Sequence, residues 1–456
     1  MSLVHLPDPQ PLPWRRPRHE VLLLALLAAA TLFVVTETNT QDASRVCLAK
    51  ALVAGRLSAD ACLRGQNDRS LYGGHFYSNK APGMSLLEIP PVEAVGLSAA
   101  PWRWNSKGDL RLWFVRLVAS GLPFLLAAFL VGRVSEGLAP GFGGAAMVTF
   151  ALGTQMAPFA AAGFSHPLTA ALGFLAFVLA SRRRPVLAGL AAGFAVTTEY
   201  DAAATFVLVL LYAALKGWRA PLLYLAGAIP GLAVLGAYDW AAFGAPWHDA
   251  NRYTYQTVSA QINSGVLGIH LPTLHDTGLV FLGDRGLLVA SPVVVAAAAG
   301  LVLVWRRGLR AEALLCAAVV AAYTLANAGY FAPLGGDSPG PRYLVPMLPF
   351  LAVGLGPAFA RWRVVTSVLA AVSIAATFVL TLSWVGFSHY RQTLWGEAVR
   401  VLKDGGAARV LTFLPNFVPT WNMNRLIGAA IILALTTAAF VVGVLRAGRY
   451  DQPVPE

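Results

Sequence analysis

Long blocks of apolar residues, separated by short polar segments, run along the whole chain of 456 residues. A helix that crosses a bilayer needs about 20 apolar residues in succession, and many of the blocks approach or exceed that length. The pattern predicts an all-α integral membrane protein with about twelve transmembrane helices. The predicted spans are 21–38, 112–132, 141–158, 166–181, 185–199, 202–216, 220–243, 286–305, 313–330, 343–360, 364–387 and 425–446.

The first apolar block follows Arg15, Arg16 and Arg18, as the apolar part of a signal peptide follows its basic residues. A clear small-x-small cleavage site is missing before Glu37, and many further spans follow. We therefore expect an uncleaved first transmembrane helix.

The composition excludes a water-soluble protein of this length. Hydrophobic residues make up 57% of the chain and charged residues only 12%, whereas soluble globular proteins carry roughly 25% charged residues. The net charge of +12 does not indicate nucleic-acid binding, because the cations lie in short clusters between apolar blocks.

These clusters predict the orientation of the chain. Alternation from a cytoplasmic N-terminus puts most of them at the cytoplasmic ends of spans, as the positive-inside rule requires. We therefore expect residues 1–20 and 447–456 to be cytoplasmic and 21–446 to form one membrane domain. The cations concerned are Arg15, Arg16, Arg18, Arg133, Arg182, Arg183, Arg184, Lys216, Arg219, Arg306, Arg307, Arg310, Arg361, Arg363, Arg446 and Arg449.

The opposite side receives longer polar segments, at 39–111, 244–285, 331–342 and 388–424. Within the first, apolar residues at helical spacing predict a short surface helix over 43–55, ending at Gly55. Residues 78–83 are typical of a turn. Residues 84–89 are apolar except for Glu88, and Pro90-Pro91 is expected to end this stretch.

The three cysteines, Cys47, Cys62 and Cys316, fit no metal-binding motif. Cys47 and Cys62 both fall in the first outer segment, where a disulfide is permitted. A disulfide and two unpaired thiols remain equally compatible with the sequence.

Ionisable residues gather at the outer ends of the spans, where they are costly unless they are paired or functional. A carboxylate among cations can accept a proton while its neighbours stabilise a departing anion. The candidates are Glu37, Asp42, His75, Lys80, His166, Glu199, Asp201, Arg252, Tyr253, Asp284, Arg285, Asp337 and Arg342.

Three stretches of sequence resemble the GT-C superfamily of membrane glycosyltransferases, which includes bacterial protein O-mannosyltransferases and aminoarabinose transferases. The most specific is the His-Phe-Tyr-Ser-Asn-Lys-Ala-Pro-Gly run at 75–83, about 30 residues after the acidic end of the first span. The others are the Gly-Gly-Asp-Ser-Pro-Gly-Pro-Arg-Tyr-Leu run at 335–344 and the Phe-Gly-Ala-Pro-Trp run at 243–247.

The resemblance implies an enzyme of the plasma (inner) membrane that transfers a hexose or pentose from a polyprenyl-phosphate donor. The sugar would be transferred to a hydroxyl group of a lipid, polysaccharide or protein acceptor on the non-cytoplasmic face. The transfer would invert the configuration at the anomeric carbon. Only Asp42 matches the family's catalytic base well. The donor-binding or substrate-binding candidates are His75, Lys80, His166, Glu199, Asp201, Arg252, Tyr253, Arg285 and Arg342. Family members often show two adjacent acids here, but Gln41 and Ala43 flank Asp42, so we predict no metal site and no cofactor.

Each candidate also has a purely structural interpretation. Asp42 is suited to cap a helix, and Lys80 could extend its amine to the interface. His166 could cap the fourth span, and Glu199 and Asp201 could be solvated turn residues. His75 and Arg252 could be surface residues, while Arg285 and Arg342 could contact headgroups or nearby aspartates.

Three other functions fit a protein of this kind. A flippase for lipid-linked sugars would be expected to show related halves and broken helices. An O-antigen ligase or polymerase would carry a different signature. A non-catalytic membrane subunit would tolerate replacement of Asp42.

Overall fold

We describe a computed structural model of the chain. It describes residues 11–36, 38–99, 110–255, 259–265, 268–336, 338–383, 393–403, 409–410 and 421–448. The candidates Glu37 and Asp337, and most of the predicted outer segment 388–424, lie outside these ranges.

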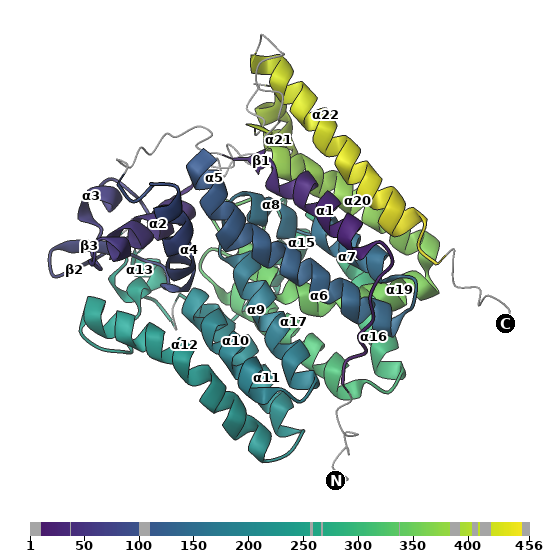
Figure 1. Cartoon of the computed structure of the whole chain (residues 1–456), viewed down its shortest axis with the longest axis horizontal. Coiled ribbons are helices and arrows are strands. Elements are labelled where there is room, and N and C mark those ends of the chain that lie inside the picture. Colours follow the sequence, from purple (N-terminus) through teal and green to yellow (C-terminus); the bar gives the residue numbers. More distant parts are fainter. Residues whose placement is uncertain are drawn as a thin grey trace.

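Helices dominate these residues, and each of the twelve predicted spans contains one or more (Figure 1). The helices before the midpoint of the chain are α1 (Glu20–Leu32), α2 (Thr40–Val53), α3 (Asp60–Leu63), α4 (Gly83–Ala94), α5 (Leu110–Arg116), α6 (Leu122–Leu138), α7 (Gly143–Gly153), α8 (Met156–Ala161), α9 (His166–Ser181), α10 (Pro185–Thr198), α11 (Ala203–Ala214) and α12 (Arg219–Phe243). Those that follow are α13 (Ser259–Ile262), α14 (Leu274–Leu282), α15 (Leu287–Ala290), α16 (Val294–Arg306), α17 (Arg310–Gly329), α18 (Leu348–Ala352), α19 (Leu355–Arg361), α20 (Arg363–Leu382), α21 (Leu394–Lys403) and α22 (Trp421–Phe440).

Not all predicted spans are long helices, so the count of twelve is not confirmed. Among the described residues, five helical stretches are long and apolar enough to cross a membrane, and the total is up to seven if each of two bent pairs counts as one span. One pair bends by 91° between α15 and α16, where Pro292 interrupts the helix. The predicted span 141–158 is likewise divided into α7 and α8 by the break at Thr154-Gln155.

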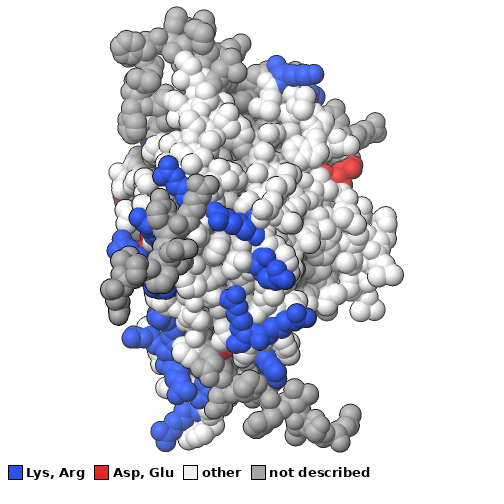
Figure 2. Space-filling model, turned by 90° about the vertical axis from the view of Figure 1, so that its right-hand side faces the viewer, with Lys and Arg blue, Asp and Glu red and all other residues white. Residues whose placement is uncertain are grey.

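The turns predicted to be cytoplasmic meet at one end of the helix assembly. Arg133 donates a hydrogen bond to Glu20 (2.8 Å), and Trp14 lies beneath the guanidinium groups of Arg133 and Arg182. Arg307 donates to the Leu138 carbonyl. Figure 2 shows lysine and arginine side chains gathered on the lower part of one face, with few carboxylates. This grouping is what alternating spans require; the side of the membrane it occupies remains a prediction.

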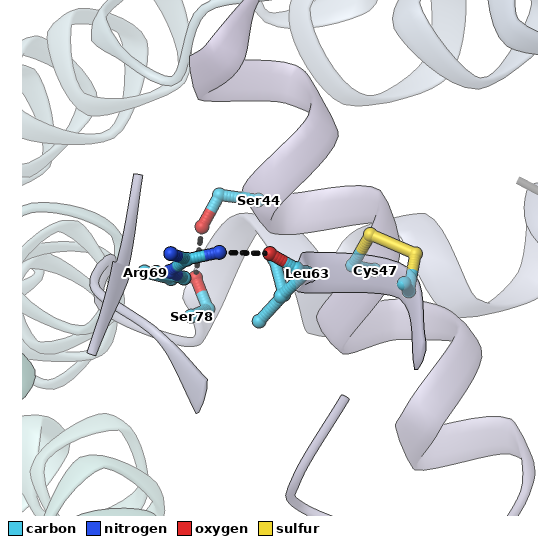
Figure 3. Close-up of a disulfide and its surroundings, with 6 residues drawn as sticks. Ser44, Cys47, Leu63, Arg69 and Ser78 are labelled. Carbon is cyan, nitrogen blue, oxygen red and sulfur yellow. Dashed lines mark hydrogen bonds between the residues drawn. A yellow bond between two sulfur atoms is a disulfide. The ribbon is translucent and has the colours of Figure 1, made fainter. Parts of the chain in front are cut away.

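The first outer segment folds into a small unit at the opposite end, on the left in Figure 1. It contains α2, α3, α4 and an antiparallel hairpin of β2 (Arg69–Tyr72) and β3 (His75–Ser78), which pair Arg69 with Ser78 and Tyr72 with His75. A disulfide joins Cys47 on α2 to Cys62 on α3. Figure 3 shows this disulfide beside two hydrogen bonds, from Arg69 to the Leu63 carbonyl and between Ser44 and Ser78.

Three local predictions for this unit need correction. The helix predicted at 43–55 begins at Thr40, because Asn39 accepts hydrogen bonds from the first exposed backbone amides. It is also buried along most of its length instead of lying on a surface. Pro90-Pro91 does not end α4, which continues to Ala94 because Val92 is buried against α2 and α5.

A second short sheet pairs β1 (Val34–Val35), directly after α1, with β4 (Arg409–Val410). Elsewhere the helices approach very closely where small residues face each other. A Cβ atom added to Gly189 of α10 would lie 1.8 Å from the Tyr224 carbonyl oxygen of α12. Small residues allow this close backbone contact between membrane helices.

Candidate active site

The start of α2 holds Asp42 in a fixed orientation. Asn39 is the N-cap residue, and the Asn39 side chain accepts a hydrogen bond from the Asp42 amide (3.0 Å). Asp42 Oδ1 accepts the Asn39 amide in return (2.9 Å), which completes a capping box. Asp42 is therefore the third residue of α2. The structural interpretation that Asp42 itself is the N-cap is wrong, because Asn39 holds that position.

The other carboxylate oxygen of Asp42 is paired with an arginine from a distant helix. Arg116 Nε donates to Asp42 Oδ2 over 2.8 Å, and the Nη2 group of Arg116 donates to the same oxygen. Arg116 Nη1 also binds the Thr36 carbonyl and hydroxyl, each at 2.9 Å. Asp42 is only 1% exposed, so two nitrogens of one guanidinium hold a single oxygen of this buried carboxylate between α2 and the predicted second span.

Burial and charge act on Asp42 in opposite directions. Burial raises the pKa of the Asp42 carboxyl above its ordinary value, whereas the charge and hydrogen bonds of Arg116 lower it. Burial is the larger effect, so the Asp42 carboxylate is a stronger base than an exposed aspartate.

A second buried ion pair lies one helical turn further along α2. Arg45 Nη2 is 2.6 Å from Glu199 Oε1 and 2.6 Å from the Ser165 hydroxyl, which itself donates to Glu199. Arg45 Nη1 binds the Gln41 carbonyl over 3.1 Å. The predicted site residue Glu199 is thus connected to α2, and the interpretation of Glu199 as a solvated turn residue is wrong.

The polar network continues from α2 to the turn after β3. Gln41 donates to Asp68 Oδ2 (3.1 Å), and Lys80 Nζ lies 3.1 Å from Asp68 Oδ1. The Arg342 guanidinium also lies within electrostatic reach of Asp68. Asp68 therefore brings two of the predicted donor-binding cations, Lys80 and Arg342, into one region.

His166 begins α9 and is buried among aromatic rings. Its ring lies 5.7 Å from that of Tyr343, and Phe159 and Phe164 pack on it. Neither ring nitrogen has a hydrogen-bond partner among the described residues. Glu199, Arg342, Arg45 and Lys80 all lie within electrostatic reach of this imidazole.

Asp201 is a buried carboxylate beside Glu199. No side chain in the described ranges donates a hydrogen bond to it. Arg342, at the other side of this region, donates to the Tyr343 hydroxyl over 2.9 Å.

Arg285 supports the loop that leads to Arg342. Its Nη1 group donates to the carbonyls of Gly336 (3.0 Å) and Ser338 (3.1 Å). The guanidinium thus fixes the backbone of the 335–344 motif, whereas a contact with Asp337 falls outside the described residues.

Three other predicted site residues lie further from the buried network. His75 pairs with Asp60 over 3.0 Å, with 60% of its side chain exposed. Arg252 is exposed. Tyr253 stacks on Phe243 with a centroid distance of 5.2 Å. No described contact joins these three to Asp42.

Several members of the network were missed by the sequence analysis. Arg116 falls inside the predicted span 112–132, and an arginine there was itself a signal of function or pairing. Arg45 follows Asp42 at helical spacing, on the same face of α2. Asp68 carried no comparable signal, because only the hairpin brings it to Lys80.

Glu88 was noted only as an exception in an apolar stretch. It is 1% exposed on α4, and its Oε2 atom has no hydrogen-bond partner among the described residues. Burial, together with the charge of Asp42, raises the pKa of Glu88 to about 8 against the opposing charges of Arg45 and Arg116. Glu88 is therefore expected to be mostly protonated at neutral pH.

The described residues contain no group of three or more His, Cys, Asp or Glu side chains arranged to hold a metal ion. Cations and carboxylates are instead paired with one another across α2, α5, α9 and α10. The arrangement suits binding and displacement of an anion beside a buried carboxylate.

Comparison with known proteins shows a shared fold without close sequence similarity. No protein family model matches the chain, and no curated protein matches it. The apo structure of ArnT from Cupriavidus metallidurans has a TM-score of 0.51 and 17% identity, and covers 94% of this chain and 77% of ArnT. The structure of ArnT from the same organism bound to undecaprenyl phosphate has a TM-score of 0.48 and 15% identity, and the match covers 93% of this chain and 76% of ArnT.

An archaeal oligosaccharyltransferase from Archaeoglobus fulgidus is a more distant match. It has a TM-score of 0.42 and 12% identity, and 92% of this chain matches 55% of that one. The chain thus spans about half the length of the archaeal protein. The overlap with apo ArnT extends over nearly the whole chain, so the chain shares the fold of that structure, in agreement with the GT-C fold expected from the sequence motifs.

Proposed function

We propose that the protein transfers a sugar from a polyprenyl-phosphate donor to an acceptor hydroxyl on the non-cytoplasmic face of the membrane. The observation that carries this proposal is the buried pair of Asp42 and Arg116, which shares one polar network with Arg45 and Lys80 in a chain with the fold of ArnT.

The reaction that we propose is a single displacement. The acceptor oxygen attacks the anomeric carbon, the bond from that carbon to the phosphate oxygen breaks, and the polyprenyl phosphate leaves with the bonding electrons. The acceptor proton passes to the carboxylate of Asp42. Attack opposite the leaving group inverts the anomeric configuration.

The donor is a phosphodiester, and its product is a phosphomonoester that carries additional negative charge. Cations placed near the phosphate stabilise that developing charge. Lys80 and Arg342 suit this role because they approach Asp68 from two different parts of the chain. Arg285 would act indirectly, by fixing the loop before Arg342.

The capping box and Arg116 suit Asp42 to the role of base. Asn39 and Arg116 fix the orientation of the Asp42 carboxylate, as a positioned general base requires.

The test is sugar transfer by the purified protein in nanodiscs. Polyprenyl phosphates carrying radiolabelled mannose or arabinose serve as donors, and a membrane extract supplies the acceptor. A general base typically contributes 10²–10⁴-fold to a rate. We therefore expect Asp42→Asn to lower the transfer rate by at least about a hundredfold while donor binding persists.

Asp60→Asn is the matched control, because Asp60 is a carboxylate of the same outer segment that pairs with the exposed His75. It should transfer sugar at the wild-type rate. Asp42→Asn alone leaves Arg116 buried without its partner, which can prevent folding. The double variant Asp42→Asn with Arg116→Gln removes both charges, and it should fold and be inactive. Full activity in a folded Asp42 variant would contradict the assignment.

A further inference from the structure

Buried polar atoms without partners concentrate beside the candidate active site. Gln155 is 0% exposed, and neither its amide oxygen nor its amide nitrogen has a hydrogen-bond partner among the described residues. His166 is 1% exposed, and neither of its ring nitrogens has a hydrogen-bond partner among the described residues. Most buried polar groups in folded proteins are satisfied, so two complete side chains without partners require a reason.

The two side chains face the same region. Gln155 is the N-cap residue of α8, and Phe159, four residues later on that helix, packs against His166 with a centroid distance of 6.0 Å. The 335–344 segment, which Arg285 supports, covers both: Gly340 lies against the Gln155 amide, and Tyr343 against the His166 ring. A Cβ atom at Gly340 would lie 1.9 Å from Gln155 Nε2. The 335–344 segment therefore covers both polar side chains.

The same region adjoins the charges assigned above to the donor phosphate. Lys80, Arg342 and Arg45 all lie within electrostatic reach of the His166 ring. A group attached to a phosphate held by Lys80 and Arg342 would therefore lie close to His166.

We propose that Gln155 and His166 form the subsite for the sugar of the donor, and that they bind the hydroxyl groups of a neutral sugar ring. This inference rests on the proposed function. It assigns a role to Gln155 and a specific ligand chemistry to the subsite.

The types of atom select the ligand class. The Gln155 amide both donates and accepts, and a neutral imidazole offers one donor and one acceptor. A hydroxyl group can also donate and accept, so a sugar ring can satisfy all four atoms. A carboxylate or phosphate only accepts and an ammonium group only donates, so either would leave part of the Gln155 amide unsatisfied.

The surrounding rings fit the same ligand. Phe159, Phe164 and Tyr343 supply apolar surface around His166. Small-molecule sites typically combine such surface with a few precisely placed polar groups.

The test compares two ligands on one protein. Wild-type protein in nanodiscs is titrated with bare polyprenyl phosphate and with polyprenyl phosphates carrying mannose, glucose or arabinose. For each sugar, the dissociation constant of the bare lipid divided by that of the sugar-carrying lipid isolates the contribution of the sugar. We expect Gln155→Met to reduce that ratio about tenfold or more, while the affinity for bare polyprenyl phosphate is unchanged.

Thermal unfolding without ligand gives a second readout. Removing unsatisfied buried polar atoms should leave the midpoint of Gln155→Met equal to or above that of the wild type. A purely structural role for Gln155 would lower it. Thr149→Val is the matched control, because Thr149 Oγ1 on α7 is also buried without a described partner. This variant should keep the wild-type ligand ratio.

The outcomes separate the two proposals. If bare polyprenyl phosphate binds but no sugar improves binding, or if Gln155→Met keeps the wild-type ratio, the sugar subsite is wrong and the proposed function is unaffected. A lowered midpoint in the Gln155 variant also overturns the inference. If the wild type binds neither kind of lipid, the proposed function itself fails and the subsite fails with it.

Discussion

The ionic groups around Asp42 form separate pairs. Arg116 pairs with Asp42, Arg45 with Glu199, and Lys80 with Asp68. Glu88 has no such cation of its own in the described ranges. Burying a charge is costly unless the charge is paired, and a carboxyl group avoids that cost by remaining protonated.

The protonation of Glu88 predicts how stability depends on pH. The ordinary pKa of 4.5 applies to the unfolded chain, and the folded value is about 8. Between these values the folded protein holds a proton that the unfolded chain has lost. The free energy of unfolding therefore falls as pH rises through this window, by up to about 1.4 kcal/mol per pH unit.

Glu88→Gln should remove this contribution, because glutamine does not titrate. We expect the variant to lose less thermal stability than the wild type between pH 5 and pH 8, measured as unfolding midpoints in detergent. Glu93→Gln serves as the control, since Glu93 lies on the exposed side of α4. Parallel pH profiles for Glu88→Gln and the wild type would contradict the prediction.

At the scale of whole elements, the packing of α10 on α12 depends on residues without side chains. A Cβ atom at Gly227 of α12 would lie 2.0 Å from the Val186 carbonyl oxygen, and one at Gly189 would lie 1.8 Å from that of Tyr224. Both contacts are with backbone, which cannot turn aside as a flexible side chain can. The two helices must separate before either position accepts a larger residue.

Gly189→Ala is therefore expected to lower the unfolding midpoint, with a cost of about 1–3 kcal/mol or more from overpacking. Gly278→Ala in α14 is the matched control, because a Cβ atom there meets nothing within 4 Å. Equal midpoints for the two variants in detergent would show that α10 and α12 do not pack as closely as described.

The lengths of individual elements were only partly predictable. Apolar periodicity located α9, α10 and α12 to within a residue or two of the predicted spans. It did not reveal the break between α7 and α8, because the residues around Thr154-Gln155 are mostly apolar. Pro90-Pro91 was expected to end the apolar stretch before it, but burial of Val92 against α2 and α5 outweighs the local effect of two prolines.

At the scale of the whole molecule, the basic turns gather at one end and the buried site at the other. The positive-inside rule then predicts that the end carrying Arg133, Arg182 and Arg307 is cytoplasmic. The first outer segment, with its disulfide, would face an oxidising compartment, where such bonds persist.

This orientation can be measured with single cysteine reporters. Arg56 follows α2 and Arg306 ends α16, and both are exposed. In intact cells a membrane-impermeant maleimide should label Arg56→Cys, whereas Arg306→Cys should react only after permeabilisation. The native cysteines should stay unlabelled, because Cys47 and Cys62 are joined and Cys316 is buried. The reverse pattern would invert the proposed topology.

The sequence by itself determined the membrane class of the protein, the places of its helices and the clustering of its cations. These features depend on runs of neighbouring residues, whose solvent preference is a local property. The motif at 75–83 also indicated a GT-C fold.

Only the tertiary structure decided which polar groups meet. Asp42 and Arg116 are 74 positions apart, and Arg45 and Glu199 are 154 apart. The role of Asp42 within its capping box, the pairing of Cys47 with Cys62 and the unsatisfied state of Gln155 likewise depend on packing. Each of these contacts joins residues that periodicity and composition treat separately, since burial is set by neighbours brought together only when the chain folds.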